Sequence, residues 1–128
     1  MREIKFRAWD TIDHEFVYGE PLYGFFASVG SEEEKIEKFY KRYKVSEFTG
    51  LKDKNGTKEY PKGQEIYEGD ILSNMISNFV VKYNLKKGAY MCGLNFLAHI
   101  VDGKNFEVIG NIYENPELLK RGLKHERN

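Results

Sequence analysis

The side chains best suited to catalysis or metal binding are widely spaced along this chain. The histidines are His14, His99 and His125, and Cys92 is the only cysteine. Structural zinc sites bring several such ligands together at short spacings. Motifs for a phosphate loop, a dinucleotide site or a nucleophilic serine elbow are absent. We therefore expect no catalytic, cofactor-binding or metal-binding residue, and we expect Cys92 to be a small buried apolar side chain.

Four aspartates at predicted turns are the only basis for a hydrolase, and they are Asp10, Asp53, Asp70 and Asp102. A metal-dependent hydrolase would require at least three of them to converge. Aspartate is also a preferred turn residue, because its carboxylate accepts hydrogen bonds from nearby backbone amides. We expect that structural role, and the hydrolase is a disfavoured alternative.

Cations and aromatic rings gather around one predicted hairpin, at Lys82, Tyr83, Lys86, Lys87 and Tyr90. Small β-barrels bind single-stranded nucleic acids through charged grooves and stacking rings of this kind. The opposing interpretation is that these are ordinary surface side chains of the strands, with lysines that discourage an edge strand from pairing with another chain. These five residues are our candidate contacts to nucleic acid or to a partner protein.

The overall charge favours a protein partner. Twenty basic and twenty acidic residues cancel, and the isoelectric point is near 6.8. A protein that holds nucleic acid through phosphate neutralisation usually carries a marked positive excess. The sequence has no apolar run long enough to span a membrane and no hydrophobic signal segment. We expect a cytoplasmic protein with no membrane contact.

The N-terminal region predicts a hairpin and one helix. Residues 3–9 alternate polar and apolar side chains, which indicates a half-buried strand, and residues 16–18 are its predicted partner. Residues 19–30 contain three glycines and Pro21, and they suit either an irregular strand or a packed loop.

The predicted helix covers about residues 31–44 and is amphipathic. Ser31 and Glu34 match a capping box, in which each side chain bonds the backbone amide of the other residue. Ile36, Phe39, Tyr40 and Tyr43 recur at helical spacing and predict one apolar face.

The second half predicts a compact sheet with tight turns. Strands are expected at 70–74, 78–84, 89–94 and 106–112, and residues 94–101 suit a strand or a buried helical turn. Together these patterns predict a mostly β (α+β) fold in a single domain. We divide it into an N-terminal hairpin plus helix (1–44), a barrel-like sheet (45–119) and a frayed tail (120–128).

Three blocks carry a family resemblance. They are MREIKFRAWD at residues 1–10, FTGLKDKNG with EIYEGDI at 48–56 and 65–71, and FEVIGNIYENPELL at 106–119. In this order and spacing they resemble the YopX family, small proteins of bacteriophages and prophages of Gram-positive bacteria. The chain departs from the family pattern by extra residues around 57–64, which favour a longer loop over a tight Asn55-Gly56 turn.

The resemblance implies an SH3-like β-barrel and no established activity. The motif positions are expected to be fold-defining, and they are Trp9, Asp10, Thr49, Gly50, Gly56, Tyr67, Gly69, Asp70, Gly110, Asn111 and Tyr113. We expect a non-enzymatic, phage-encoded accessory protein that binds a host or phage protein. Single-stranded nucleic-acid binding is the alternative. Edge strands and abundant aromatic residues are also compatible with a homo-oligomer.

Overall fold

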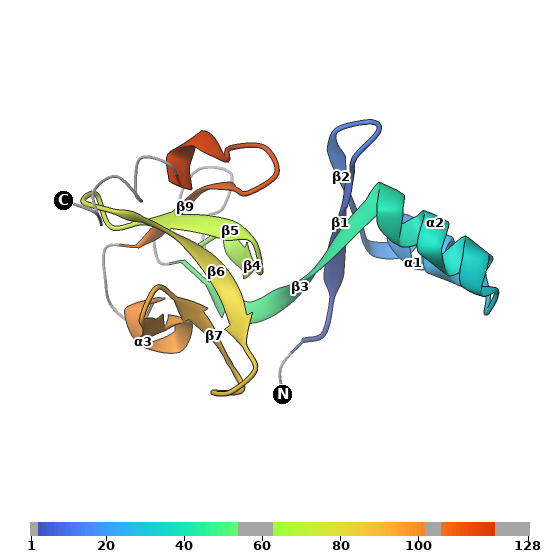
Figure 1. Cartoon of the computed structure of the whole chain (residues 1–128). Helices are drawn as coiled ribbons and strands as arrows, with labels where there is room; N and C mark the ends of the chain where they lie inside the picture. Colours follow the sequence, from blue (N-terminus) through green and yellow to red (C-terminus); the bar gives the residue numbers. More distant parts are fainter. Residues whose placement is uncertain (1–2, 54–62, 102–105, 120–128) are drawn as a thin grey trace. The chain divides into compact units, whose positions relative to one another are not determined.

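The computed structural model describes residues 3–53, 63–101 and 106–119, and it divides the chain into two compact units, Met1–Phe48 and Thr49–Asn128. The fold is mostly β, as the sequence predicts, with one sheet in the order β2-β1-β3-β4 and another in the order β8-β7-β6-β5-β9 (Figure 1). Strand β3 (Tyr43–Lys52) runs through the boundary between the units. Each unit has its own buried core.

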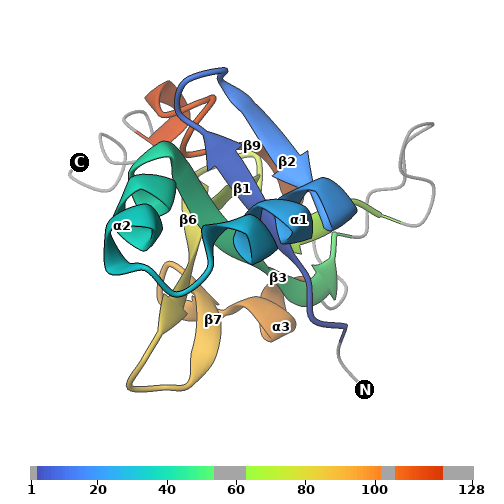
Figure 2. The same ribbon diagram turned by 90° about the vertical axis from the view of Figure 1, so that its right-hand side faces the viewer.

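The first unit is a three-stranded antiparallel arrangement with two helices. Strand β1 (Phe6–Asp10) lies between β2 (Glu15–Tyr18) and the first half of β3. The predicted hairpin of β1 and β2 is therefore confirmed. Helices α1 (Gly19–Val29) and α2 (Glu33–Arg42) lie on the same side of these strands (Figure 2). Ala8, Leu22 and Phe39 form the buried centre of this unit.

The structure corrects three expectations for the first unit. Residues 19–29 form helix α1, where the sequence suggested a strand or a loop. The capping box is not formed, because α2 begins at Glu33 after Glu32, which makes no side-chain cap bond. Tyr40 is 52% exposed and so does not belong to the buried face of α2.

The expectation of a half-buried β1 is also wrong. Arg7, Ala8, Trp9 and Asp10 are all buried, so both faces of the strand are covered. One face is covered because Ala8 packs with Leu22 and Phe39 of the two helices. The polar residues of β1 have partners on elements that are distant in sequence. The Nε of Arg7 donates to Ser46 Oγ at 3.2 Å, and the Trp9 ring meets Phe16 edge-on at 5.0 Å.

The second unit contains the predicted strands of the C-terminal half. Strands β5 (Asp70–Ser73), β6 (Asn78–Asn84), β7 (Ala89–Cys92) and β9 (Glu107–Asn111) confirm the four segments expected from alternation. Residues 95–101 form the short β8 (Asn95–Phe96) and then helix α3 (Leu97–Val101). The short β4 (Glu65–Tyr67) belongs to the other sheet. Ile66, Leu72, Val81, Cys92 and Leu97 lie at the centre of the core.

The Gly69-Asp70 turn shows how the motif positions act locally. Gly69 has a φ of 91°, a conformation that side-chain-bearing residues rarely adopt. Asp70 is buried, and its Oδ2 accepts a hydrogen bond from the backbone amide of Tyr67 at 2.8 Å. Gly69 also donates to the carbonyl of Val81 and accepts from Ile112, so the turn ties three segments together.

Two further motif blocks make similar contacts. Thr49 Oγ1 donates to the carbonyl of Ile66 at 2.7 Å, next to Gly50 with a φ of 86°. The Oδ1 of Asn111 accepts from the amides of Tyr113 and Glu114, and a Cβ at Gly110 would collide with the Asn115 side chain. Gly56, the Asn55-Gly56 turn, the predicted turn at Asp102 and the tail 120–128 lie outside the described residues.

Candidate partner-binding pocket

A surface pocket of about 390 Å³ lies against the hairpin of β6 and β7 in the second unit. This volume falls at the lower end of the range typical of ligand sites. Its lining is mainly apolar and amide-bearing, with one cation, and consists of Asn78, Phe79, Val80, Lys82, Tyr83, Asn84, Met91, Gly93 and Leu119.

Strand alternation explains how β6 forms this pocket. Val81 is fully buried, and with its register partner Cys92 it points into the core. Successive side chains of a strand point to opposite faces. Asn78, Val80, Lys82 and Asn84 therefore share the outer face of β6, and all four line the pocket.

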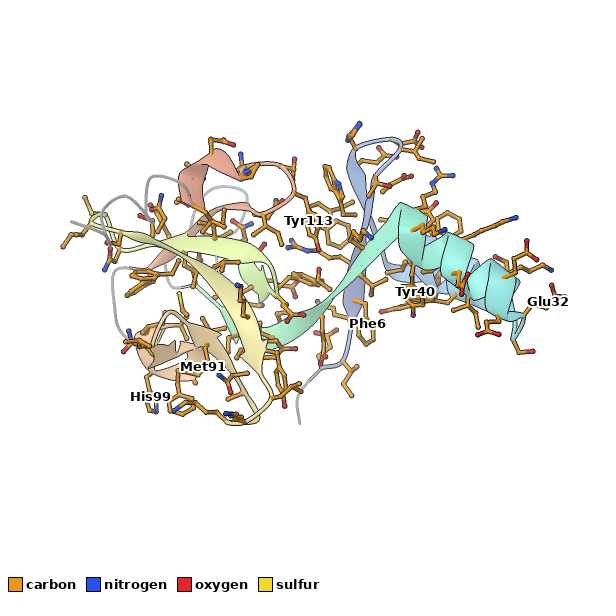
Figure 3. All side chains as sticks on the ribbon, in the orientation of Figure 1. Phe6, Glu32, Tyr40, Met91, His99 and Tyr113 are labelled. Atoms are coloured by element: carbon orange, nitrogen blue, oxygen red, sulfur yellow. The ribbon has the colours of Figure 1, made fainter. Side chains whose placement is uncertain are left out.

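Met91 forms the apolar floor on this outer face. It is the register partner of Lys82 on β6 and of Phe96 on β8, so the three side chains form one cross-strand row. Met91 is only 7% exposed, although alternation places it on the face of β7 opposite to the core residue Cys92; Figure 3 labels it on this strand. Phe96 is flanked by the His99 ring at 5.4 Å and by Lys87 Nζ at 5.5 Å from its centroid.

The hairpin divides the five predicted contact residues between two faces. Lys82 lines the pocket, and Lys87 reaches the same outer face through Phe96. Tyr83 and Tyr90 are register partners on the opposite face, and their rings meet edge-on at 5.1 Å. Tyr83 is 42% exposed and also borders the pocket, whereas Tyr90 packs against the core. Lys86 is exposed in the connecting turn.

Sequence reasoning missed seven of the nine lining residues, which are Asn78, Phe79, Val80, Asn84, Met91, Gly93 and Leu119. For the residues on β6, the alternation of the strand was the available signal, since positions 78, 80, 82 and 84 share a face. Met91 and Leu119 required the register and the tertiary structure. Asn78 Nδ2 donates to the carbonyl of Leu118 at 3.1 Å, which holds the C-terminal segment of the described chain against β6.

Comparison with known proteins places the chain in a family. The family model described as YopX protein matches residues 5–120, which is nearly the whole sequence. This chain belongs to the YopX family. It is similar to a solved structure titled "Crystal structure of protein EF1440 from Enterococcus faecalis", with 26% sequence identity and a TM-score of 0.60. The similarity covers 93% of this chain and 99% of that one. No curated protein matches.

The turn aspartates of this YopX-family chain bind backbone amides. The two carboxylate oxygens of Asp53 accept from Gln64 at 2.8 Å and from Val108 at 3.0 Å. Asp70 accepts from Tyr67, as described above. Within residues 3–53, 63–101 and 106–119, no three His, Cys, Asp or Glu side chains are placed to hold a metal ion. Asp102 lies outside these ranges.

Asp10 has a charged partner as well as amide partners. Its carboxylate accepts from Arg42 Nη2 at 2.9 Å and Nε at 3.1 Å, and from the amides of Ile12 and Asp13. The bonds from Arg42 hold the pKa of the Asp10 carboxyl well below its ordinary value. Arg42 is the last residue of α2, so this pair joins the helix to the end of β1.

Cys92 is buried in the core, and burial raises the pKa of its thiol to about 12. The thiolate is the nucleophilic form of cysteine, so at neutral pH Cys92 is a packed apolar group. Across the part of the chain that the structure describes, no helix is long and apolar enough to cross a membrane.

Proposed function

We propose that this YopX-family chain is a phage- or prophage-encoded accessory protein that acts in the host cytoplasm as a non-enzymatic binding module. Its partner in this proposal is a host or phage protein, bound at the β6–β7 pocket. The observation that carries the proposal is the pocket itself, which combines an apolar floor at Met91 with an exposed cation at Lys82.

Two further observations support binding over chemistry. Asp10, Asp53 and Asp70 accept the structural hydrogen bonds given above, and the Cys92 thiol is buried. A pocket that combines apolar surface with several polar groups is suited to binding a ligand or a partner side chain. The equal numbers of acidic and basic residues favour a protein partner over a polyanion.

Affinity capture with matched variants tests this proposal. Immobilised wild-type protein, Lys82→Glu and Lys86→Glu are exposed to lysates of bacteria that carry the phage or prophage. Both variants make the same charge change in one hairpin, but only Lys82 lines the pocket. We expect a protein that binds wild type and Lys86→Glu and is lost from Lys82→Glu. Recovery of the same proteins by immobilised wild type and both variants would contradict the proposal.

Single-stranded nucleic-acid binding is the second candidate, because the half-exposed Tyr83 ring lies near the exposed lysines of the turn. Stacking on Tyr83, with Lys86 and Lys87 beside the backbone, is the expected mode. A filter-binding titration with single-stranded DNA at two ionic strengths tests it. Binding that weakens as salt rises, and that is reduced in Lys86→Glu, would favour this function. Undetectable binding at low salt would remove it.

Two finer structural proposals accompany the function. We propose that the five-stranded sheet belongs to an SH3-like barrel, which is the architecture that the family resemblance implies. Self-association is also proposed, because β2, β8 and β9 are terminal strands in their sheets and such strands offer unpaired backbone groups. Light scattering across a concentration series would reveal a dimer or trimer.

A further inference from the structure

We infer that the β6–β7 pocket binds an extended protein segment in which an aliphatic or aromatic side chain is next to Asp or Glu. This inference rests on the proposed function and adds the chemistry of the partner. It is carried by the distribution of charge and hydrogen-bonding groups along the outer face of β6.

Among the described residues that line the pocket, Lys82 is the one with a charged side chain. Within residues 3–53, 63–101 and 106–119, no Asp or Glu lines the pocket. Within the described ranges, Lys82 forms no ion pair. A carboxylate is the side-chain group that complements this cation, and electrostatic complementarity favours such a partner over a neutral or basic one.

Asn84 adds a second donor at the same end of the pocket. Its Oδ1 accepts a hydrogen bond from the backbone amide of Lys87 at 2.9 Å, which leaves its Nδ2 as a donor. Lys82 and Asn84 are two residues apart on one strand and therefore share a face. This end of the pocket thus offers two donors to one anionic group.

Most of the remaining lining is apolar, with Asn78 and Tyr83 as the other polar side chains. Val80 lies two residues before Lys82 on the same face, Met91 lies opposite Lys82, and Phe79 and Leu119 also line this region. Methionine adapts its shape to different apolar groups, which suits a floor that accepts aliphatic or aromatic side chains. The order along β6 predicts an apolar anchor near Val80 and a carboxylate near Lys82.

Side-chain recognition fits better than strand addition at this end of β6. The backbone amide of Tyr83 already donates to Glu68 Oε2 at 3.1 Å, so it is engaged before any added strand arrives. β7 occupies the opposite edge of β6, with Lys82 paired to Met91 and Tyr83 to Tyr90. A partner segment would therefore lie across the outer face and be recognised through its side chains.

Methionine-methyl NMR provides a direct test. Protein labelled with ¹³C at the methionine methyl groups is titrated with acetyl-Phe-Glu-amide, acetyl-Phe-Gln-amide and acetyl-Phe-Lys-amide. Met91 reports on the pocket floor, and Met75, which is 89% exposed and does not line the pocket, is the internal control. We expect a Met91 shift with the Glu peptide, about two- to five-fold weaker binding of the Gln peptide, and the weakest binding of the Lys peptide.

Two variants assign the charge preference to a residue. Lys82→Met keeps most of the side-chain length and removes the charge, so it should abolish the difference between the Glu and Gln peptides. Lys86→Met makes the same change in the turn and should preserve that difference. Equal binding of all three peptides to wild type would overturn the inference while leaving a pocket that binds aromatic segments. No Met91 shift with any peptide would overturn the proposed binding function as well.

Discussion

Replacing Asp10 by asparagine should destabilise the first unit at neutral pH. Asp10 is 3% exposed, and its carboxylate accepts hydrogen bonds from Arg42 and from the amides of Ile12 and Asp13. Asparagine has nearly the same shape, and its carbonyl oxygen can still accept from the two amides. The substitution therefore removes mainly the charge and the acceptor of the bond from Arg42 Nη2.

The size of this destabilisation depends on the hydrogen bond that is lost and on how far water can solvate Arg42 in its place. Hydrogen bonds to charged groups contribute about 1.5–3 kcal/mol. The Arg42 side chain is 39% exposed, so water can replace part of the interaction. We expect the free energy of unfolding to fall by about 2 kcal/mol at pH 7.

The pH dependence has a defined sign. The pKa of Asp10 is lowered in the folded state, so its stabilisation is fully present above the unfolded pKa of about 4. It is lost as the pH falls below that value toward the folded pKa. The difference in stability between wild type and Asp10→Asn should therefore shrink as the pH falls below about 4.

Urea denaturation at a series of pH values measures this effect, with Asp13→Asn as the matched control. Asp13 also contacts Arg42 Nη2, at 3.3 Å, but its side chain is 57% exposed. We expect Asp13→Asn to stay within about 0.5 kcal/mol of wild type. If Asp10→Asn is as stable as Asp13→Asn at pH 7, the structural role assigned to the buried pair is wrong.

Three other perturbations test separate parts of the structure. Gly24→Ala should raise the free energy of unfolding by about 0.5–1 kcal/mol in urea denaturation. Gly24 lies within α1, and a Cβ there meets nothing within 4 Å. A loss of stability would argue against α1. Gly69→Ala should lower it by about 1–2 kcal/mol, because the φ of 91° strains any side-chain-bearing residue; an unchanged value would contradict that turn geometry. Cys92 should react with a thiol reagent only on unfolding, because it is buried and its thiol pKa is raised to about 12; rapid reaction of the folded protein at neutral pH would contradict this placement.

The strands of the second unit were predictable because their signals are local. Alternation predicted the span of β6, and the hairpin predicted around Lys82–Tyr90 is formed by β6 and β7. Helix α1 was missed because three glycines and Pro21 indicate a loop. The useful signal was Leu22, Phe26 and Val29 at helical spacing, which face the core of the first unit.

Burial was harder to predict than secondary structure. In β1 the polar residues Arg7 and Asp10 are buried because they find partners on β3 and α2, which lie more than 30 residues away. The candidate site shows the same limit. Lys82 and Tyr83 start on opposite faces of β6, yet both line the pocket, which strand alternation alone does not predict. Met91 could be identified as the floor of the pocket only from its strand register with Lys82, which the structure supplies.

Site-specific photo-crosslinking in the host cell tests the central claim most directly. A photoreactive phenylalanine analogue replaces Tyr83, which borders the pocket, or Tyr40, an exposed tyrosine on α2 in the first unit. We predict a protein adduct from position 83 that is lost when Lys82→Glu is added, and no such adduct from position 40. Adducts from position 40 alone, or from position 83 to nucleic acid alone, would contradict a protein-binding pocket on the β6–β7 hairpin.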